Sequence, residues 1–276
     1  MIVSVRGIEM HALVAGAGPA LLLLHGFTGS AETWRPFLPE LAACRRVIAP
    51  DLIGHGRTAA PADAARYRMD ECVADLLALL DRLGVGEFAV LGYSMGGRVA
   101  LHLALAVPER VRALILESAS PGITNPAERA ERARSDEALA GFIEREGIAA
   151  FVERWESQPL FASQRSLPAE VWARLRAERL GQRPRGLANS LRGMGAGAMA
   201  PVWNRLGELG VPVLVLAGEL DAKYVAIART VGERLPRARV AIVPGAGHAV
   251  HLEQPAQFLE LVTAFLGLGG EGGARS

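Results

Sequence analysis

One short motif in the sequence has residue types that could perform nucleophilic catalysis. Gly92-Tyr93-Ser94-Met95-Gly96 follows an apolar run and precedes the helical pattern RVALHLALA. A serine at this spacing, on a sharp turn from a strand into a helix, exposes its hydroxyl at the end of a sheet. The glycines let the strand and the helix approach each other although the backbone at the serine is strained. The motif therefore predicts Ser94 as the central catalytic residue.

A base and an acid stand at the ends of two later apolar runs. His248 closes the segment VPGAGH, and Asp221 closes LAGELD. An imidazole can take the proton of Ser94, and a carboxylate can fix the tautomer of that imidazole and stabilise its cation. Serine, aspartate and histidine follow one another along the chain in the order of the α/β-hydrolase fold. We therefore predict a catalytic triad of Ser94, Asp221 and His248.

Other residues offer alternatives for two of these roles. Glu117 ends the run LILES and Glu219 lies near Asp221, so either could orient the histidine or line a pocket. The remaining histidines have structural interpretations: His11 and His102 lie in ordinary strand and helix patterns, His55 lies in the loop DLIGHG, and His251 follows His248 too closely to share its geometry.

Backbone amides near Ser94 could stabilise a developing negative charge. His25-Gly26-Phe27 follows the run ALLLL, where this fold supplies one amide of an oxyanion hole. The residue after the nucleophile, Met95, would supply the other. We expect the amides of Phe27 and Met95 to form the oxyanion hole, His25 to hold that loop by hydrogen bonds, and Phe27 to form part of the pocket wall.

The elements that must position these residues can be predicted from hydrophobic patterning. Apolar runs typical of buried parallel strands begin at Ala20, Arg46, Phe88, Arg112, Pro212 and Arg239. Amphipathic segments such as 69–84, which ends at a glycine suited to a helix C-terminus, lie between them. Strand and helix alternate as in βαβ units. We predict an α/β-hydrolase fold, with a mostly parallel eight-stranded sheet flanked by helices.

The strand pattern is interrupted in the second half of the chain. From Pro121 to about Leu206 the sequence carries helical patterns, arginines and tryptophans but no strand-like run. We predict a helical cap, or lid, over 121–206, inserted in a core made of 1–120 and 207–267. The glycine-rich end, 268–276, has too little apolar content to pack and is expected to be a flexible tail.

The composition of the chain argues against some classes of binding partner. Half of the 276 residues are hydrophobic, and a net charge of +1 with interspersed signs leaves no basic face for nucleic acid or an anionic membrane. The first residues lack the features of a signal peptide, and no apolar run approaches the roughly 18 residues of a membrane span, so we expect a cytoplasmic protein. Cys44 and Cys72 lack disulfide or metal-ligand spacing and are expected to be core thiols. The sequence predicts a small-molecule partner and carries no signal of oligomeric state.

Arg98 adds a constraint on that small molecule. It lies four residues after Ser94 on the same predicted helix, so its side chain is on the same face about one turn away. An unpaired buried charge costs on the order of several kcal/mol. Arg98 therefore requires either an anionic substrate or an internal salt bridge, and spacing alone leaves both open.

Several segments resemble one enzyme family. GYSMGGRVAL, SPGITNPAERAERARSDEALA, FVERWESQPLFAS, GELDAKY and GAGHAVHLEQP are similar to the corresponding segments of 2-succinyl-6-hydroxy-2,4-cyclohexadiene-1-carboxylate (SHCHC) synthase of menaquinone biosynthesis. The resemblance runs from about His25 to Pro255. Its most specific parts are the arginine after the serine motif, AERARSD and WESQPLFAS, because generic hydrolases of this fold rarely carry all three.

The resemblance implies roles for particular residues. It implies catalysis by the triad and binding of substrate carboxylates by Arg98, Arg132 and Arg176, with Tyr93, Trp155 and Phe27 lining the pocket. Around Arg176 the match is poorer, and Arg174 and Arg179 lie nearby.

The reaction of that family eliminates pyruvate from a cyclohexene that carries succinyl, carboxylate and enolpyruvyl groups. Three anionic groups are a reason for several arginines, because the guanidinium fork binds carboxylates in a bidentate manner. We expect Ser94 and His248 to remove the ring proton next to the succinyl ketone, with no metal and no cofactor. The alternatives are a serine hydrolase of an anionic ester or carbon-carbon bond, and a non-catalytic ligand receptor, against which the intact triad argues.

Overall fold

The computed structural model describes residues 1–267, and the predicted flexible tail, 268–276, lies outside them. The described residues form an eight-stranded sheet in the order β1-β2-β4-β3-β5-β6-β7-β8. The strands from β3 to β8 pair in parallel, while β2 pairs antiparallel with both β1 and β4. The predicted mostly parallel sheet is thus confirmed. Its strands are β1 (Ile2–Val5), β2 (Ile8–Ala15), β3 (Ala20–Leu24), β4 (Arg46–Pro50), β5 (Phe88–Tyr93), β6 (Val111–Glu117), β7 (Val213–Gly218) and β8 (Ala238–Val243).

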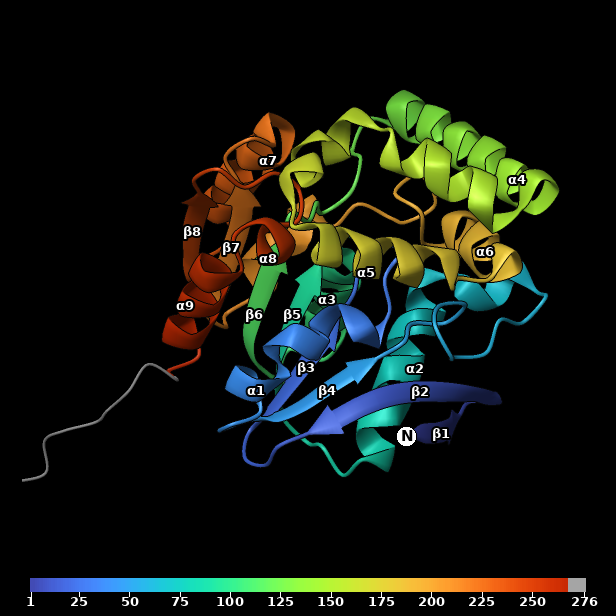
Figure 1. Ribbon diagram of the computed structural model, residues 1–276. Helices are drawn as coiled ribbons and strands as arrows, with labels where there is room; N and C mark the ends of the chain where they lie inside the picture. The colour runs from blue at the N-terminus through green and yellow to red at the C-terminus, as the bar shows by residue number, and fades with distance from the viewer. Residues whose placement is uncertain (268–276) are drawn as a thin grey trace, which may run out of the picture.

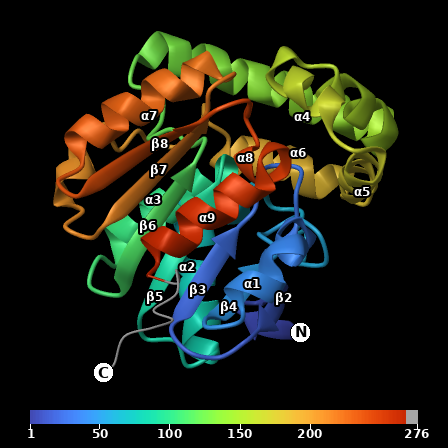
Figure 2. The same cartoon turned by 60° about the vertical axis from the view of Figure 1, so that its left-hand side comes forward.

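Helices cover both faces of the sheet, which explains why its central strands are apolar throughout. In β3, Leu22 and Leu24 belong to one hydrophobic cluster, and Leu21 and Leu23 belong to another. The first cluster includes residues of α2 (Met69–Arg82), α3 (Met95–Ala106) and α7 (Ala222–Arg234), and the second includes residues of α1 (Leu38–Leu41) and α9 (Pro255–Phe265). Figure 2 shows α9 in front of the sheet and α3 behind it. Short helices complete this part: η1 (Ala31–Phe37), η2 (Ala64–Tyr67) and α8 (Val250–Glu253).

Residues 118–212, between β6 and β7, hold helices and no strand; we refer to them as the helical insertion. Its elements are α4 (Pro126–Glu156), η3 (Pro159–Ser166), α5 (Ala169–Leu180), α6 (Pro184–Met194) and η4 (Trp203–Glu208). Gly147, with φ 80° and ψ 179°, interrupts α4 and divides it into two helical pieces. The insertion has a hydrophobic cluster of its own, centred on Ile143, Phe151 and Leu187. Figure 1 shows α4, α5 and α6 at the end of the sheet toward which β5 and β6 point.

Two details refine the sequence analysis. The helix predicted at 69–84 is α2, and Gly84 beyond its end has φ +67°, a conformation suited to glycine. Cys72 is buried as expected, but Cys44 is exposed, so the prediction of a core thiol is wrong there. The reason is that Cys44 belongs to the turn between α1 and β4 and not to either element. No helix within residues 1–267 is both long enough and apolar enough to cross a membrane.

Candidate active site

Ser94 occupies a strained turn between β5 and α3. Its φ of 51° and ψ of −106° lie outside the regions that a residue with a side chain ordinarily adopts. The turn is crowded, since a Cβ atom on Gly92 would collide with the carbonyl of Gly96, and one on Gly96 with the carbonyl of Leu24. The Ser94 amide donates to the carbonyl of Glu117 at 2.8 Å, which fixes the turn on β6. The predicted packing reason for the two glycines therefore applies here.

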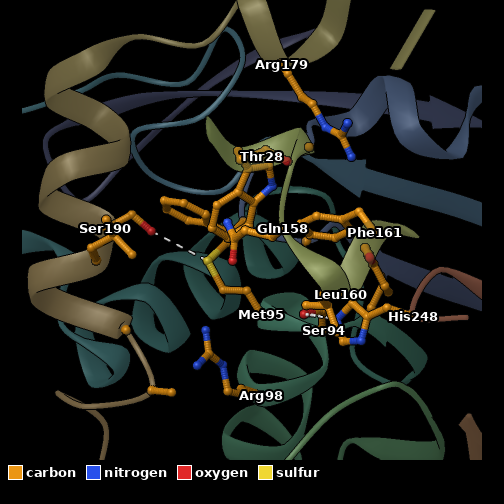
Figure 3. A pocket seen from close by; sticks show the side chains of 18 of the residues that line it. Thr28, Ser94, Met95, Arg98, Gln158, Leu160, Phe161, Arg179, Ser190 and His248 are labelled. Atoms are coloured by element: carbon orange, nitrogen blue, oxygen red, sulfur yellow. Dashed lines mark hydrogen bonds between the residues drawn. The ribbon is translucent and has the colours of Figure 1, made fainter. Parts of the chain in front are cut away.

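The structure brings Ser94, His248 and Asp221 together at the carboxyl ends of three strands. His248 Nε2 lies 3.0 Å from Ser94 Oγ, and His248 Nδ1 lies 2.7 Å from Asp221 Oδ2. Figure 3 shows the contact between Ser94 and His248 at the edge of a pocket. The imidazole and the carboxylate are both buried, and the other oxygen of Asp221 accepts from the Tyr224 amide at 3.2 Å. This geometry suits proton transfer from serine to an oriented imidazole.

The alternative acids have other partners. Glu117 Oε1 lies 2.8 Å from Nδ1 of His251 and accepts from the His251 amide at 3.0 Å. Glu219 accepts from the amide of Gly245 at 3.1 Å. Neither acid is bonded to His248, so Asp221 alone is placed to orient it among residues 1–267.

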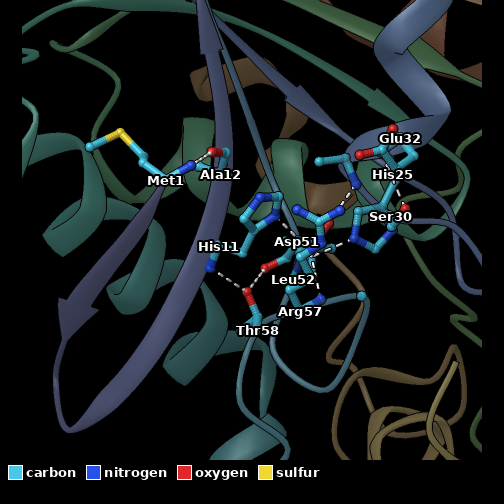
Figure 4. Close-up of polar contacts among 12 residues, drawn as sticks. Met1, His11, Ala12, His25, Ser30, Glu32, Asp51, Leu52, Arg57 and Thr58 are labelled. Atoms are coloured by element: carbon cyan, nitrogen blue, oxygen red, sulfur yellow. Dashed lines mark hydrogen bonds and ion pairs between the residues drawn. The ribbon is translucent and has the colours of Figure 1, made fainter. Parts of the chain in front are cut away.

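His25 holds the loop that follows β3. Its Nδ1 lies 2.8 Å from the Gly26 carbonyl, and its Nε2 accepts from the Leu52 amide at 3.0 Å. Burial lowers the pKa of His25 to about 4, so the ring is neutral and has one N–H to donate. Figure 4 shows His25, Leu52, Asp51 and Ser30 in this polar region. The contacts agree with the structural interpretation of His25.

Phe27 and Met95, whose amides are the predicted oxyanion donors, line the same cavity. No described residue within 1–267 accepts a hydrogen bond from the amide of Phe27 or of Met95. We refer to residues 26–30 as the oxyanion loop; Gly26, Phe27, Thr28 and Gly29 all line the cavity at Ser94. The two amides are therefore free to donate to a substrate oxygen.

The cavity beside Ser94 has a volume of about 350 Å³. One wall is aromatic: the Trp155 ring lies 5.3 Å from the ring of Phe27 and 5.3 Å from that of Phe161. Tyr93 also lines it, and burial raises the pKa of its phenol well above the ordinary value. The polar side chains of the lining include Arg98, Arg132, Arg179, Lys223, Tyr224 and Gln158.

Arg98 is a cation without an acidic partner in the described part of the chain. No Asp or Glu within residues 1–267 lies at ion-pair distance from it, and its Nε atom is buried without a hydrogen-bond partner. Burial lowers the pKa of this guanidinium; the charge of Arg132 acts in the same direction, while Tyr224 and Asp136 act in the opposite one. Figure 3 shows Arg98 among the side chains that surround the pocket, close to Met95. The internal salt bridge left open by the sequence is therefore not found, and the cation remains available to an anionic ligand.

The other two predicted arginines differ from Arg98 and from each other. Arg132 lines the cavity, and its Nε donates to Asp136 Oδ1 at 2.8 Å. Arg176 is not part of the cavity lining; it is ion-paired with Glu156, and its side chain is 37% exposed. Its place in the cavity is taken by Arg179, which lies one turn further along α5.

Arg179 is held on both sides. Its Nη2 donates to Gln164 Oε1 at 3.0 Å and its Nη1 to Glu156 Oε1 at 3.2 Å. The residue is 2% exposed, and burial lowers the pKa of its guanidinium. The third arginine of the cavity is thus at 179 and not at 176, because the face of α5 that lines the cavity carries Leu175 and Arg179, four residues apart, and Arg176 lies about 100° around the helix from Leu175. Lys223 and Tyr224, which the sequence analysis did not name, line the cavity because they follow Asp221 in the first turn of α7.

Comparisons with known proteins show the family of this chain. The family described as alpha/beta hydrolase fold matches residues 19–255. A Bacillus subtilis (strain 168) protein that bears the name 2-succinyl-6-hydroxy-2,4-cyclohexadiene-1-carboxylate synthase provisionally is 47% identical over 257 residues, covering 92% of this chain and 93% of that protein. The synthase of that name from Salmonella paratyphi C (strain RKS4594) is 32% identical over 91% of this chain and 94% of its own length.

Solved structures give the same result. The structure of MenH from S. aureus superposes with a TM-score of 0.89 at 36% identity, and the match covers 94% of this chain and 97% of that chain. The identities and coverages of these relatives show the narrower family. The chain therefore belongs to the α/β-hydrolase fold family and, within it, to the family of 2-succinyl-6-hydroxy-2,4-cyclohexadiene-1-carboxylate synthases.

Proposed function

We propose that this protein eliminates pyruvate from 2-succinyl-5-enolpyruvyl-6-hydroxy-3-cyclohexene-1-carboxylate to give 2-succinyl-6-hydroxy-2,4-cyclohexadiene-1-carboxylate. The observation that carries the proposal is Arg98, a cation without an acidic partner within residues 1–267, in the cavity of Ser94. A substrate with three carboxylates supplies the missing negative charge. Membership of the synthase family supports the same reaction.

The triad would act as a base in this reaction. His248 accepts the proton of Ser94, and Ser94 Oγ removes the ring proton next to the succinyl ketone. The electron pair moves onto the ketone oxygen, where the amides of Phe27 and Met95 stabilise the enolate. In comparable sites one such donor contributes about 2.7 to 4 kcal/mol to the lowering of the barrier.

Pyruvate leaves in the second step of the reaction. When the enolate collapses, a ring double bond forms at the deprotonated carbon, the existing double bond shifts, and the carbon-oxygen bond to the enolpyruvyl group breaks. The departing enolate of pyruvate takes up a proton, for which protonated His248 is a suitable source through Ser94. No acyl-enzyme forms, so serine serves as a proton relay.

The cations and the helical insertion would bind the substrate and exclude water. We propose carboxylate binding by Arg98, by Arg132, which shares its charge with Asp136, and by Arg179, which shares its charge with Glu156. The insertion contributes Arg132, Trp155, Phe161 and Arg179 to the lining, which supports a role as a cap over the reacting atoms.

The test is turnover of the enolpyruvyl cyclohexene with pyruvate release and diene absorbance followed together. The parent protein is expected to release both products, and Ser94→Ala and Arg98→Ala to lose most of the activity. Arg134→Ala is the matched control, because Arg134 lies on α4 near Arg132 but is exposed and bonded to Glu131. Its activity should equal that of the parent.

A serine hydrolase of an anionic ester or of a carbon-carbon bond is the second candidate. The contact of 3.0 Å between His248 and Ser94 and the free amides also suit acyl transfer. Absence of turnover with fresh cyclohexene substrate, together with an acyl-enzyme at Ser94 from an activated anionic ester, would replace the synthase assignment with this one.

A further inference from the structure

The first half of the oxyanion loop is held by the sheet side of the molecule. His25 Nδ1 lies 2.8 Å from the Gly26 carbonyl, and His55 Nε2 lies 2.6 Å from the Phe27 carbonyl. Both histidines are buried. These contacts hold the carbonyls that flank the Phe27 amide, and the Gly29 amide donates to the Gly26 carbonyl at 3.0 Å, so the second half of the loop is coupled to the first. The next contact with the sheet side is at Asp51, whose Oδ1 accepts from the Ala31 amide at 2.6 Å.

The second half of the loop is held by the helical insertion. Glu178 Oε1, on the last turn of α5, accepts from the Ser30 amide at 2.7 Å, the Ser30 hydroxyl at 2.6 Å and the Thr33 hydroxyl at 2.8 Å. Gln182 Nε2 donates to the Gly29 carbonyl at 3.0 Å and to the Thr28 carbonyl at 3.3 Å. Its Oε1 accepts from the Gly56 amide at 3.0 Å. Each residue from Thr28 to Ser30 therefore has a bond to α5 or to the residues just after it.

The carboxyl group of Glu178 is removed from most of the solvent. Glu178 lies in surroundings that raise the pKa of its carboxyl group, because burial penalises the charged form. A buried carboxylate loses its hydration, and hydrogen bonds to its oxygens are needed to offset that cost. Here one oxygen serves three donors, all from the segment that contains and follows the oxyanion loop.

Arg179 connects this anchor with the cavity. It directly follows Glu178 in the chain, but its guanidinium lines the cavity and is bonded to Gln164 and Glu156. The same helical turn thus carries a cation that lines the cavity and the carboxylate that holds the loop. Because a helical turn is rigid on this scale, the position of the Phe27 amide and that of the Arg179 guanidinium are set relative to each other.

We propose that Glu178 and Gln182 are positioning residues for the reaction: they hold the oxyanion loop so that the Phe27 amide meets the enolate oxygen of a substrate whose carboxylate is bound by Arg179. The proposal rests on the proposed function for the role of that amide. Removing the Glu178 anchor loosens the loop and leaves Arg179 in place, since Glu156 and Gln164 still hold it. Transition-state stabilisation falls while ground-state binding is kept.

The test compares Glu178→Ala, Glu178→Gln and Gln182→Ala with the parent in kcat, KM and amide hydrogen exchange. Loss of a complete oxyanion donor costs about a hundredfold or more in kcat, so a misaligned donor in Glu178→Ala is expected to cost roughly tenfold to a hundredfold, with KM changed by less than about threefold. Glu178→Gln keeps an acceptor oxygen and should recover most of kcat. Peptides covering 26–33 should exchange faster in Glu178→Ala.

Glu170→Ala is the matched control, because Glu170 is an exposed glutamate on the first turn of the same helix. It should match the parent in every measurement. Unchanged kcat and unchanged exchange of 26–33 in Glu178→Ala would overturn the proposal. So would a rise in KM at constant kcat, which would mean that α5 acts through Arg179 alone.

Two further experiments test the proposal if Glu178→Ala does not fold or if the parent protein does not turn over the cyclohexene. If Glu178→Ala fails to fold, two other variants remove part of the anchor: Gln182→Ala removes the bonds to the Thr28 and Gly29 carbonyls, and Thr33→Val removes one of the three bonds to Glu178. Both should show a smaller effect of the same kind. If the parent does not turn over the cyclohexene, the proposed function fails on its own, and exchange of 26–33 together with Ser94-dependent cleavage of an activated ester still decides whether the anchor positions the loop.

Discussion

Glu117 and His251 form a second buried carboxylate–imidazole pair next to the triad, with Oε1 of the acid 2.8 Å from Nδ1 of the histidine. Both side chains are fully buried, and the His251 ring packs 4.7 Å from the ring of Tyr93, which precedes the catalytic serine. Two acids thus stand at the ends of neighbouring strands, and each has its own histidine. Asp221 is bonded to His248, which reaches Ser94, whereas Glu117 is bonded to a histidine that does not.

This division predicts different consequences for the two acids. Asp221→Asn should lower kcat by about 10⁴-fold, as in other triads, because the imidazole is then held in the wrong tautomer. Glu117→Ala should mainly destabilise the fold, by about 1–3 kcal/mol for each buried group left without a partner. Steady-state kinetics and urea unfolding of both variants check this. A loss of kcat in Glu117→Ala as large as that in Asp221→Asn would contradict it.

The two buried histidines at the oxyanion loop predict how stability depends on pH. Burial lowers the pKa of His25 to about 4 and that of His55 to about 3, so both are neutral when folded and take up protons on unfolding below about pH 6.5. The free energy of unfolding should therefore fall as the pH falls from about 6.5 toward 4, by roughly 3 kcal/mol for His25 at the lower end.

Urea unfolding between about pH 7 and pH 5 is the measurement, because most carboxylates stay ionised over that range. His25→Gln, compared at each pH, should show a shallower dependence than the parent. A parent whose stability does not change across this range would exclude the neutral state of the buried rings.

Arg98 should lower the stability of the ligand-free protein. It is half-buried and has no acidic partner within residues 1–267, so Arg98→Met is expected to raise the free energy of unfolding by about 1 kcal/mol while activity is lost. Thermal unfolding without ligand and the turnover assay together test this. A variant that is both inactive and less stable than the parent would indicate a structural role for the guanidinium.

Arg179 and Arg176 should differ in how much each contributes to substrate binding. Arg179→Ala removes a cation from the cavity and should lower kcat/KM by roughly tenfold to a hundredfold, the value of a charged hydrogen bond. Arg176→Ala should stay within about twofold, because that side chain is outside the cavity lining and a partly exposed ion pair contributes little. Equal effects of the two substitutions would mean that the substrate also reaches Arg176.

The sequence predicts those parts of the molecule that depend on local patterns. The runs that begin at Ala20 and Phe88 are recognisable as strands because nearly all of their residues are apolar. The serine motif is recognisable because its glycines and its serine lie within five consecutive residues. The order of Ser94, Asp221 and His248 needed only the ends of three such runs.

Contacts between segments that are far apart in the sequence could not be predicted from local patterns. Glu178 and Ser30 are 148 residues apart, and nothing in the pattern around either one indicates the other. The choice between Arg176 and Arg179 depends on which face of α5 is turned toward the cavity, and the partner of Glu117 depends on how α8 packs. In each instance the residues suit their own local segments, so local periodicity carries no information about the pairing.

The contact between Glu178 and the oxyanion loop has a consequence for building chimeras of related enzymes. A helical insertion transplanted from a relative would bring its own cavity arginine, but full turnover would also need a carboxylate at position 178 and a side-chain amide at position 182 that fit the host loop. A graft without them would bind the ligand but convert it more slowly. Insertion and host loop thus need to be exchanged together as one unit.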